Sequence, residues 1–235
     1  MILFVMLLMT PTLYAQQADS EIFIQQSGQS LTLEINQIGQ GNALGSLSNT
    51  DPFVLNGVSQ EITINQIGSY NTMLGALYGD SIQGTFNFTG DSNLFNIKVN
   101  DGGLQSAESG VYLFNIVGSS NDFDITVGDS AVADNINMNW DITGDYNTFL
   151  SKTNSDNYTS DITLNGNYNN LDILASGFAG HSVTIDHTGD YTNFNITQTS
   201  TLEKNIISLE TTTSGTALVP TTICIHQSDT GVTGC

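Results

Sequence analysis

The sequence predicts an all-β fold, a β-solenoid of about seven strand–arc–strand coils with a degenerate C-terminal cap. Two observations lead to this prediction. A glycine recurs along the chain at intervals of 22 to 29 residues, and the residues on either side of it alternate between apolar and polar. Alternation with a period of two is typical of strands. A recurring interval of this length favours a solenoid coil over a hairpin with the same local pattern.

The first fifteen residues predict a signal peptide. An apolar run from residue 2 to residue 9 is followed by a small residue, Ala15, that suits cleavage before Gln16. The alternative is a buried N-terminal strand. The run is too short to cross a bilayer, so we expect the mature chain to be secreted and located outside the cell or on its surface.

Each predicted coil carries a glycine followed, three residues later, by an asparagine. Glycine suits a turn with an unusual backbone conformation, and asparagine tolerates left-handed geometry. Stacked asparagines could also form an amide ladder between coils; the alternative is that they are turn residues only. The pairs are Gly39 and Asn42, Gly68 and Asn71, Gly90 and Asn93, Gly118 and Asn121, Gly144 and Asn147, and Gly166 and Asn169. The seventh coil has Gly189 with Thr192.

The residues four and two positions before each glycine are predicted to face the core. In the seventh coil this places His187 inside, as a hydrogen-bonded core residue rather than a catalytic base. The fifth residue after each glycine is also apolar throughout. The positions four before are Ile35, Ile64, Phe86, Phe114, Trp140, Ile162 and Ile185, and the positions two before are Gln37, Gln66, Phe88, Ile116, Ile142, Leu164 and His187.

Coil lengths above the minimum require insertions. Residues 49–57 and 101–110 are interpreted as loops that bulge from the arc between coils, and residues 129–135 as a smaller one. Residues 22–28 repeat the first-strand pattern half a coil early, which indicates an N-terminal half-turn. The repeats therefore extend over residues 16–198, and residues 199–235 form a degenerate terminal coil or cap.

The two cysteines, Cys224 and Cys235, lie close enough in sequence to be bridged in an oxidising compartment. Such a disulfide would hold the C-terminal tail with about 2–4 kcal/mol. Two free thiols, or a bridge to another chain, are the alternatives.

The charge of the chain excludes several functions. The net charge is −20, and the only cations are Lys98, Lys152 and Lys204. Binding a phosphate backbone needs several cationic contacts, so we expect no nucleic-acid partner. We also expect no membrane span, cofactor, bound metal or enzymatic activity. A glycan-acting β-helix enzyme is the remaining enzyme alternative. Asp91, Asp145 and Asp190 alternate with neutral residues along the coils, which fits charge spacing better than calcium binding.

The segments Gln37-x-Gly39-x-x-Asn42 and Gln66-x-Gly68-x-x-Asn71 resemble the curlin repeat, which builds curli, the extracellular functional-amyloid fibres of bacteria. The glycine–asparagine part of the motif continues through six coils, over roughly residues 33–175. From Gly90 onward an apolar residue replaces the first Gln. The resemblance implies a fibre subunit in which Gln37 and Gln66 form an inner ladder.

We therefore expect an exported structural subunit of a curli-like amyloid fibre, which assembles by edge-to-edge coil stacking for cell adhesion and biofilm matrix. Its partners would be copies of itself and possible other curlin-like subunits. The strand around Ile22, Phe23 and Ile24 has little charge to deter pairing, and is the predicted self-association edge. The alternative is a capped, non-polymerising β-solenoid adhesin, or a surface protein that decorates virions or fibres.

Overall fold

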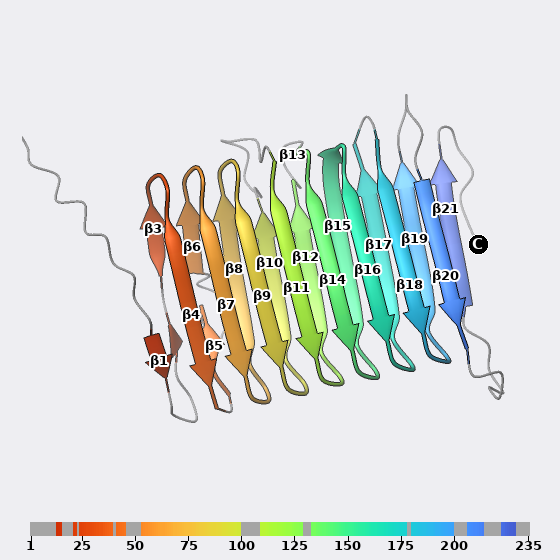
Figure 1. Cartoon of the computed structure of the whole chain (residues 1–235), viewed down its shortest axis with the longest axis horizontal. Coiled ribbons are helices and arrows are strands. Elements are labelled where there is room, and N and C mark those ends of the chain that lie inside the picture. Colours follow the sequence, from red (N-terminus) through yellow and green to blue (C-terminus); the bar gives the residue numbers. More distant parts are fainter. Residues whose placement is uncertain are drawn as a thin grey trace, which may run out of the picture.

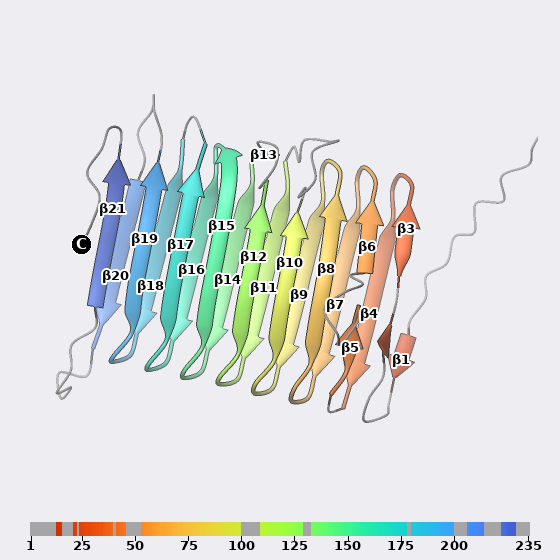
Figure 2. The same ribbon diagram turned by 180° about the vertical axis from the view of Figure 1, so that it is seen from behind.

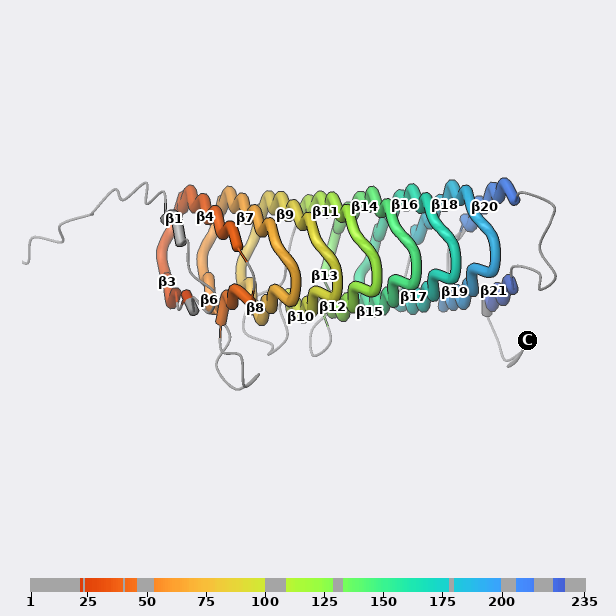
Figure 3. The backbone as a smooth tube through the Cα atoms, turned by 90° about the horizontal axis from the view of Figure 1, so that it is seen from below, coloured from red at the N-terminus to blue at the C-terminus, as the bar shows by residue number. Residues whose placement is uncertain are grey.

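The computed structural model describes residues 13–15, 21–22, 24–39, 41–45, 53–99, 109–128, 133–177, 180–199, 206–213 and 222–228. All of the secondary structure in these ranges is β-strand, and every strand pair is parallel. The strands form two stacked sheets joined by arcs, as the tube in Figure 3 shows. The predicted β-solenoid is therefore confirmed. The described residues include no helix that could cross a membrane.

Sheet A contains the strands that precede the repeated glycines, and it faces the viewer in Figure 1. Each of its long strands has seven residues, with alternate side chains buried. Its strands, in spatial order, are β1 (Leu13–Ala15), β4 (Thr32–Ile38), β7 (Glu61–Ile67), β9 (Gln83–Thr89), β11 (Val111–Val117), β14 (Asn137–Thr143), β16 (Thr159–Asn165), β18 (Ser182–Thr188) and β20 (Ile206–Thr212).

Sheet B contains the strands that follow the glycines, and it faces the viewer in Figure 2. Its main path is β2 (Glu21–Ile22), β5 (Ala43–Leu44), β8 (Thr72–Tyr78), β10 (Leu94–Val99), β12 (Asp122–Val127), β15 (Thr148–Asp156), β17 (Asn170–Ser176), β19 (Asn193–Thr199) and β21 (Thr222–Ser228). Three short strands lie beside this path: β3 (Gln25–Ser27), β6 (Phe53–Asn56) and β13 (Ala133–Asp134).

Equivalent residues of successive coils pair in register. Phe86 lies beside Phe114, which lies beside Trp140, which lies beside Ile162. The predicted inward positions are buried in all seven aligned coils. Their side chains form one continuous core between the sheets. Residues that recur at one coil position therefore stack into columns along the solenoid, and each column buries its members against their neighbours.

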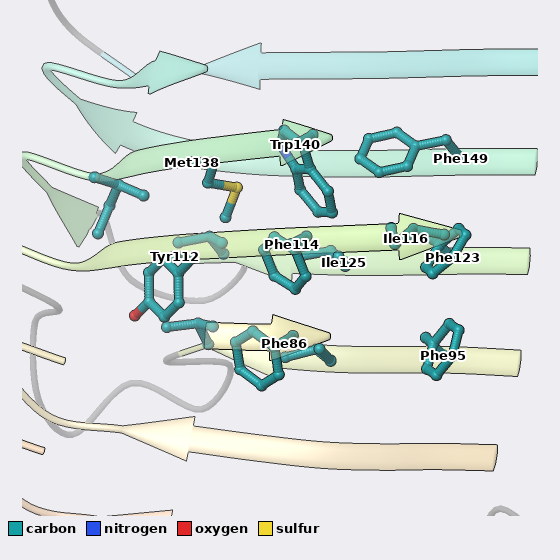
Figure 4. Packing of buried hydrophobic residues seen from close by; sticks show 14 of the residues in the cluster. Phe86, Phe95, Tyr112, Phe114, Ile116, Phe123, Ile125, Met138, Trp140 and Phe149 are labelled. Carbon is teal, nitrogen blue, oxygen red and sulfur yellow. The ribbon is translucent and has the colours of Figure 1, made fainter. Parts of the chain in front are cut away.

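Aromatic side chains occupy the middle of this core, as Figure 4 shows. Phe86 stacks on Phe114 with ring centroids 4.8 Å apart, and Phe114 stacks on Trp140 at 3.9 Å. From the opposite sheet, Phe149 meets Trp140 edge-on at 4.2 Å. Aromatic pairs of this geometry stabilise a core beyond the area they bury.

The loop predicted at residues 49–57 is only partly a loop. Phe53–Asn56 forms strand β6, which pairs with β3 on one side and β8 on the other. Phe53 is fully buried and lies beside Gly75. A Cβ at Gly75 would come within 2.3 Å of the Phe53 ring, so the glycine makes room for it. The insertion thus interrupts a strand of sheet B rather than the arc, and the chain returns to the sheet at Phe53.

The described strands at the two ends extend the solenoid. Leu13–Ala15, assigned from the sequence to the end of a leader, forms β1 and pairs with β4. The predicted N-terminal half-turn is present as β2 and β3, both in sheet B. At the other end β20 and β21 continue both sheets in register as a terminal coil.

Candidate functional site

The arc that leads from sheet A to sheet B, here called the first arc, contains the asparagine ladder. From Asn71 to Asn169, the side-chain Oδ1 of each first-arc asparagine accepts a hydrogen bond from the backbone N–H of the equivalent asparagine one coil earlier. These side chains are almost fully buried, so each satisfies a backbone donor that water cannot reach. The N–H···Oδ1 distances are 3.3 Å for Asn42 to Asn71, 2.8 Å for Asn71 to Asn93, 2.9 Å for Asn93 to Asn121, 3.0 Å for Asn121 to Asn147 and 2.8 Å for Asn147 to Asn169.

Two of these side chains, those of Asn71 and Asn93, also close their own arc. The Nδ2 of Asn71 donates to the carbonyl oxygen of Gly68 at 2.9 Å, and that of Asn93 donates to the carbonyl oxygen of Gly90 at 2.9 Å. One asparagine therefore closes its own turn and binds the coil before it. Both roles considered from the sequence, turn residue and ladder, are combined in one side chain.

The repeated glycines have a steric reason as well as a conformational one. Gly118 has a φ of 145°, which residues with a side chain rarely adopt. A Cβ at Gly118 would lie 1.9 Å from the carbonyl oxygen of Gly90, one coil earlier. The same clash, at 1.6 to 2.0 Å, recurs at Gly90, Gly144, Gly166 and Gly189. The backbones of successive arcs thus approach too closely for any other residue.

Gln37 and Gln66 form the inner ladder that the resemblance implies. Both are fully buried, and the Nε2 of Gln66 donates to the Oε1 of Gln37 at 2.5 Å. The Nε2 of Gln37 donates in turn to the carbonyl oxygen of Ala43 at 3.1 Å. At the next coil Phe88 takes this position and stacks on Phe95 at 3.8 Å. The amide ladder is therefore limited to the first two coils, and a dry aromatic core follows it.

Two further ladders were not identified from the sequence. On the outer face of sheet A, Nδ2 of Asn65 donates to Oδ1 of Asn36 at 2.6 Å, and Asn87 and Asn115 continue the chain of amides at 2.6 and 2.7 Å. These asparagines stand one residue after each core position, so their recurrence was visible in the sequence. Its meaning depended on coil-to-coil register, which only the structure provides.

The second of these ladders runs along the residues that directly follow the glycines. Asp91 accepts the backbone N–H of Ser119 at 2.6 Å, and Asp145 accepts that of Asn167 at 2.5 Å. Asn167 in turn accepts the backbone N–H of Asp190 at 2.7 Å. Asp91 and Asp145, interpreted from the sequence as charge spacing, thus bind the next coil. Among the described residues, no group of three or more His, Cys, Asp and Glu side chains could hold a metal ion.

The residue pattern of the second arc, which leads back from sheet B to sheet A, was not identified from the sequence. Gly57 and Gly79 lie in it, and a Cβ at Gly79 would come within 1.7 Å of the Gly57 carbonyl oxygen. Ser59 and Ser81 follow two residues later with positive φ angles of 57° and 55°. The signal was a Gly-x-Ser pattern with the interval of one coil. The coils between Gly79 and Gly177 lack this glycine, which hid the pattern.

An exposed tyrosine stack lies on the first arc of the last three aligned coils. The rings of Tyr146 and Tyr168 are 4.8 Å apart, those of Tyr168 and Tyr191 are 4.5 Å apart, and both pairs are parallel to within 2°. Desolvation and the neighbouring Tyr191 and Tyr146 raise the pKa of Tyr168. Each tyrosine takes the left-handed position two residues after its glycine, with φ near 60°. The stack displays ring edges and hydroxyl groups in a row along one side of the solenoid.

The histidines provide no catalytic arrangement among the described residues. His187 is fully buried. The prediction of a core residue agrees with this position. Burial lowers the pKa of His187, and its ring meets Phe194 edge-on at 5.1 Å. His181 lies in the second arc, with Nε2 2.8 Å from the carbonyl oxygen of Ser155.

The last coil leaves inward-facing apolar side chains uncovered by any described strand. Ile223 and Ile225 occupy core positions beside Phe194 and Ile196, yet their exposures are 46% and 44%, against 0% for both partners. Ile207 and Leu209 of β20 are also only partly buried. At the other end Ile22 and Ile24 pack partly against the core, whereas Phe23 lies outside the described residues. The apolar interior is thus open at the C-terminal end of the described solenoid.

Cys224 lies on the outward side of β21 and takes part in a disulfide. Cys235, the other cysteine of the sequence, lies outside the described residues.

Comparison with known proteins adds no identity. No protein-family model matches the chain, and no curated protein or solved structure gives a significant match to it. The likeness to curlin therefore depends on the motif residues and on the coil geometry that they produce.

Proposed function

We propose that this chain is an exported structural subunit that assembles end to end, coil upon coil, into a curli-like extracellular fibre. The fibre would serve cell adhesion and the cohesion of a biofilm matrix, with further copies of the chain as the principal partners. The observation that carries the proposal is the open interior of the last coil, where Ile223 and Ile225 are about half exposed at core positions.

Edge-strand chemistry supports the same assembly. β20 and β21 are the last described strands of their sheets, and none of the described strands pairs with their outer edges. An edge of this kind presents unpaired backbone donors and acceptors to any extended chain. A neighbouring copy would satisfy them and would cover the apolar side chains at the same time. Because Ile223 and Ile225 are already about half buried, each would gain about half of the roughly 1.5–3 kcal/mol that complete burial of such a side chain contributes.

Charge is the main force opposing such assembly. The net charge of −20 makes two copies repel each other. Salt screens exposed charges over a Debye length of about 8 Å at physiological ionic strength. The apolar interior, by contrast, brings neutral groups together. We therefore expect salt to accelerate assembly.

The experiment compares two substitutions in the last coil. Leu209→Asp places a carboxylate in the interior, where a neighbouring copy would leave it buried without a partner. Ser208→Asp adds the same charge at the adjacent outward position, in the column where Asp161 already stands. We expect Leu209→Asp to raise the concentration needed for half-maximal assembly at least about tenfold. The control should change it by less than about threefold. If Leu209→Asp assembles at the same half-maximal concentration as the wild type, the proposal is contradicted.

The second candidate, a non-polymerising adhesin or fibre-decorating protein, is favoured by the exposed tyrosine stack of Tyr146, Tyr168 and Tyr191. Aromatic residues are common in binding surfaces because they contribute large contact area at low entropic cost. A chain that stays monomeric at every salt concentration, and loses surface adhesion on Tyr168→Ala, would favour this candidate.

A further inference from the structure

The two ends of the solenoid present the same side chains at the same core positions. At the start, Ile22 lies beside Leu44, and the carbonyl oxygen of Ile24 accepts the N–H of Val54 at 2.7 Å, which places Ile24 beside Phe53. At the end, Ile223 and Ile225 lie beside Phe194 and Ile196. Following the register from coil to coil, Ile22 and Ile223 belong to one column, and Ile24 and Ile225 belong to the next.

The strand count makes these ends compatible without a gap. Nine strands lie on the path through sheet A, from β1 to β20, and nine lie on the main path through sheet B, from β2 to β21. The described chain thus begins with a strand of sheet A and ends with a strand of sheet B. A second copy can follow with its β1 beside β20 and its β2 and β3 beside β21, so that neither sheet gains or lacks a strand.

From these observations, and on the basis of the proposed function, we infer that a second copy docks in one register. Ile22 and Ile24 of that copy cover Ile223 and Ile225 of the first, and β1 of that copy pairs with β20. The junction then repeats the coil-to-coil contact found within the chain. The partner is a second copy because its first coil supplies what the last coil lacks: apolar side chains to cover Ile223 and Ile225, and strands to pair with the outer edges of β20 and β21.

The same register locates the end of the leader. Cleavage before Gln16 would remove β1 and leave eight strands on the sheet A path against nine on the sheet B path. Docking of β2 and β3 on β21 would then leave one strand position of sheet A empty at every junction. The backbone groups facing that position would lose their partners. The assembling chain therefore retains Leu13–Ala15, and any leader ends before Leu13.

The test of the register copies a packing arrangement found within the chain. Phe53 lies beside Gly75 in the column of Ile24 and Ile225, and the missing side chain of the glycine leaves room for the phenylalanine ring. Ile225→Phe should overpack the junction and weaken end-to-end association about tenfold or more. Ile24→Gly in the same full-length chain should make room for the ring and recover most of that loss. The matched control combines Ile22→Gly with Ile225→Phe. This variant has the same added space at the neighbouring inward position, two residues earlier in the strand, where it cannot accept the ring. Sedimentation equilibrium measures the association, and circular dichroism verifies the β-sheet content of each monomer.

The outcomes separate this register from the proposed function. Recovery by the Ile24→Gly combination but not by the Ile22→Gly combination supports the register. Association of the wild type without selective recovery overturns the register but leaves end-to-end assembly standing. A wild type that never associates overturns both. Mass spectrometry of assemblies recovered from an exporting host gives their first residue: a start at or before Leu13 agrees with the retained β1, and a start at Gln16 contradicts it.

Discussion

The side-chain Oδ1 of Asn93 accepts the backbone N–H of Asn71, one coil earlier, at 2.8 Å. The Nδ2 of Asn93 donates at the same time to the carbonyl oxygen of Gly90, which closes its own arc. A short amide side chain therefore connects two coils and fixes a turn. The Oδ1 contact recurs between each pair of neighbouring coils from Asn42 to Asn169, so it is the regular cross-link of the solenoid.

Replacing Asn93 by alanine should leave the buried N–H of Asn71 without an acceptor. The expected loss is about 1–3 kcal/mol in the free energy of unfolding, and Asn121→Ala should cost a similar amount. The control is Asn96→Ala on the outer face of β10, where water can replace the amide. Urea unfolding followed by circular dichroism measures the difference. Equal midpoints for Asn93→Ala and the control would contradict the ladder.

Gly118→Ala should destabilise the solenoid more than any asparagine change. Its Cβ would lie 1.9 Å from the Gly90 carbonyl oxygen, and its φ of 145° is unfavourable for alanine. We expect a loss of at least about 3 kcal/mol. Gly28→Ala is the matched control, because Gly28 has a φ of 158° but no described atom within 4 Å of its Cβ position. Thermal unfolding compares the two variants, and similar midpoints would mean that backbone conformation alone explains the glycines.

His187 should make stability depend on pH. Burial lowers its pKa in the folded chain, while the nearby carboxylates of Asp190 and Asp186 oppose that shift. The unfolded chain therefore binds the proton more readily. The stability that the neutral ring contributes to the fold is fully present above the unfolded-state pKa of about 6.5. This stability is lost as pH falls below that value. His187→Gln, which places here the residue found at Gln37 and Gln66, should remove this part of the dependence. Unfolding midpoints at pH 7.5 and 5.5 test it, and equal slopes for the two proteins would refute the assignment.

Phe53→Ala should test the strand that follows the first insertion. Phe53 is fully buried and fills the space left by Gly75, so its removal leaves a cavity. The expected cost is about 3–5 kcal/mol. Val54→Ala, at the adjacent outward position of β6, should cost less than about 1 kcal/mol. If both variants unfold at the wild-type denaturant concentration, residues 53–56 do not form part of the core.

The sequence alone predicts the solenoid because period-two alternation and the glycine–asparagine pairs recur in phase. The inward positions follow from the same alignment, and all of them are buried, from Ile35 to Ile185. The features that the sequence alone does not predict are those that depend on the register between coils. Phe53 could not be identified as a core residue, because an insertion separates it from its repeat. The outward asparagines from Asn36 to Asn115 were visible, but their hydrogen bonds require neighbours that are 22 to 29 residues apart in sequence.

The tyrosine stack illustrates the same limit. Tyr146, Tyr168 and Tyr191 stand two residues after their glycines, where the coils of Gly90 and Gly118 have Ser92 and Ser120. A turn position tolerates either residue type, so nothing in the sequence alone connected the three rings. Once the coils are stacked, their separation of 4.5 to 4.8 Å follows directly from the spacing of adjacent strands.

Assembly of the full-length chain across a salt series tests the central claim most directly. Electron microscopy and sedimentation would follow the purified protein at a fixed concentration as ionic strength rises. The open ends of the solenoid favour association, whereas the net charge of −20 makes two copies repel each other. We therefore expect unbranched fibres or end-to-end oligomers that form faster as salt increases. A β-rich monomer at every salt concentration would show that the ends do not pair, and would contradict the account.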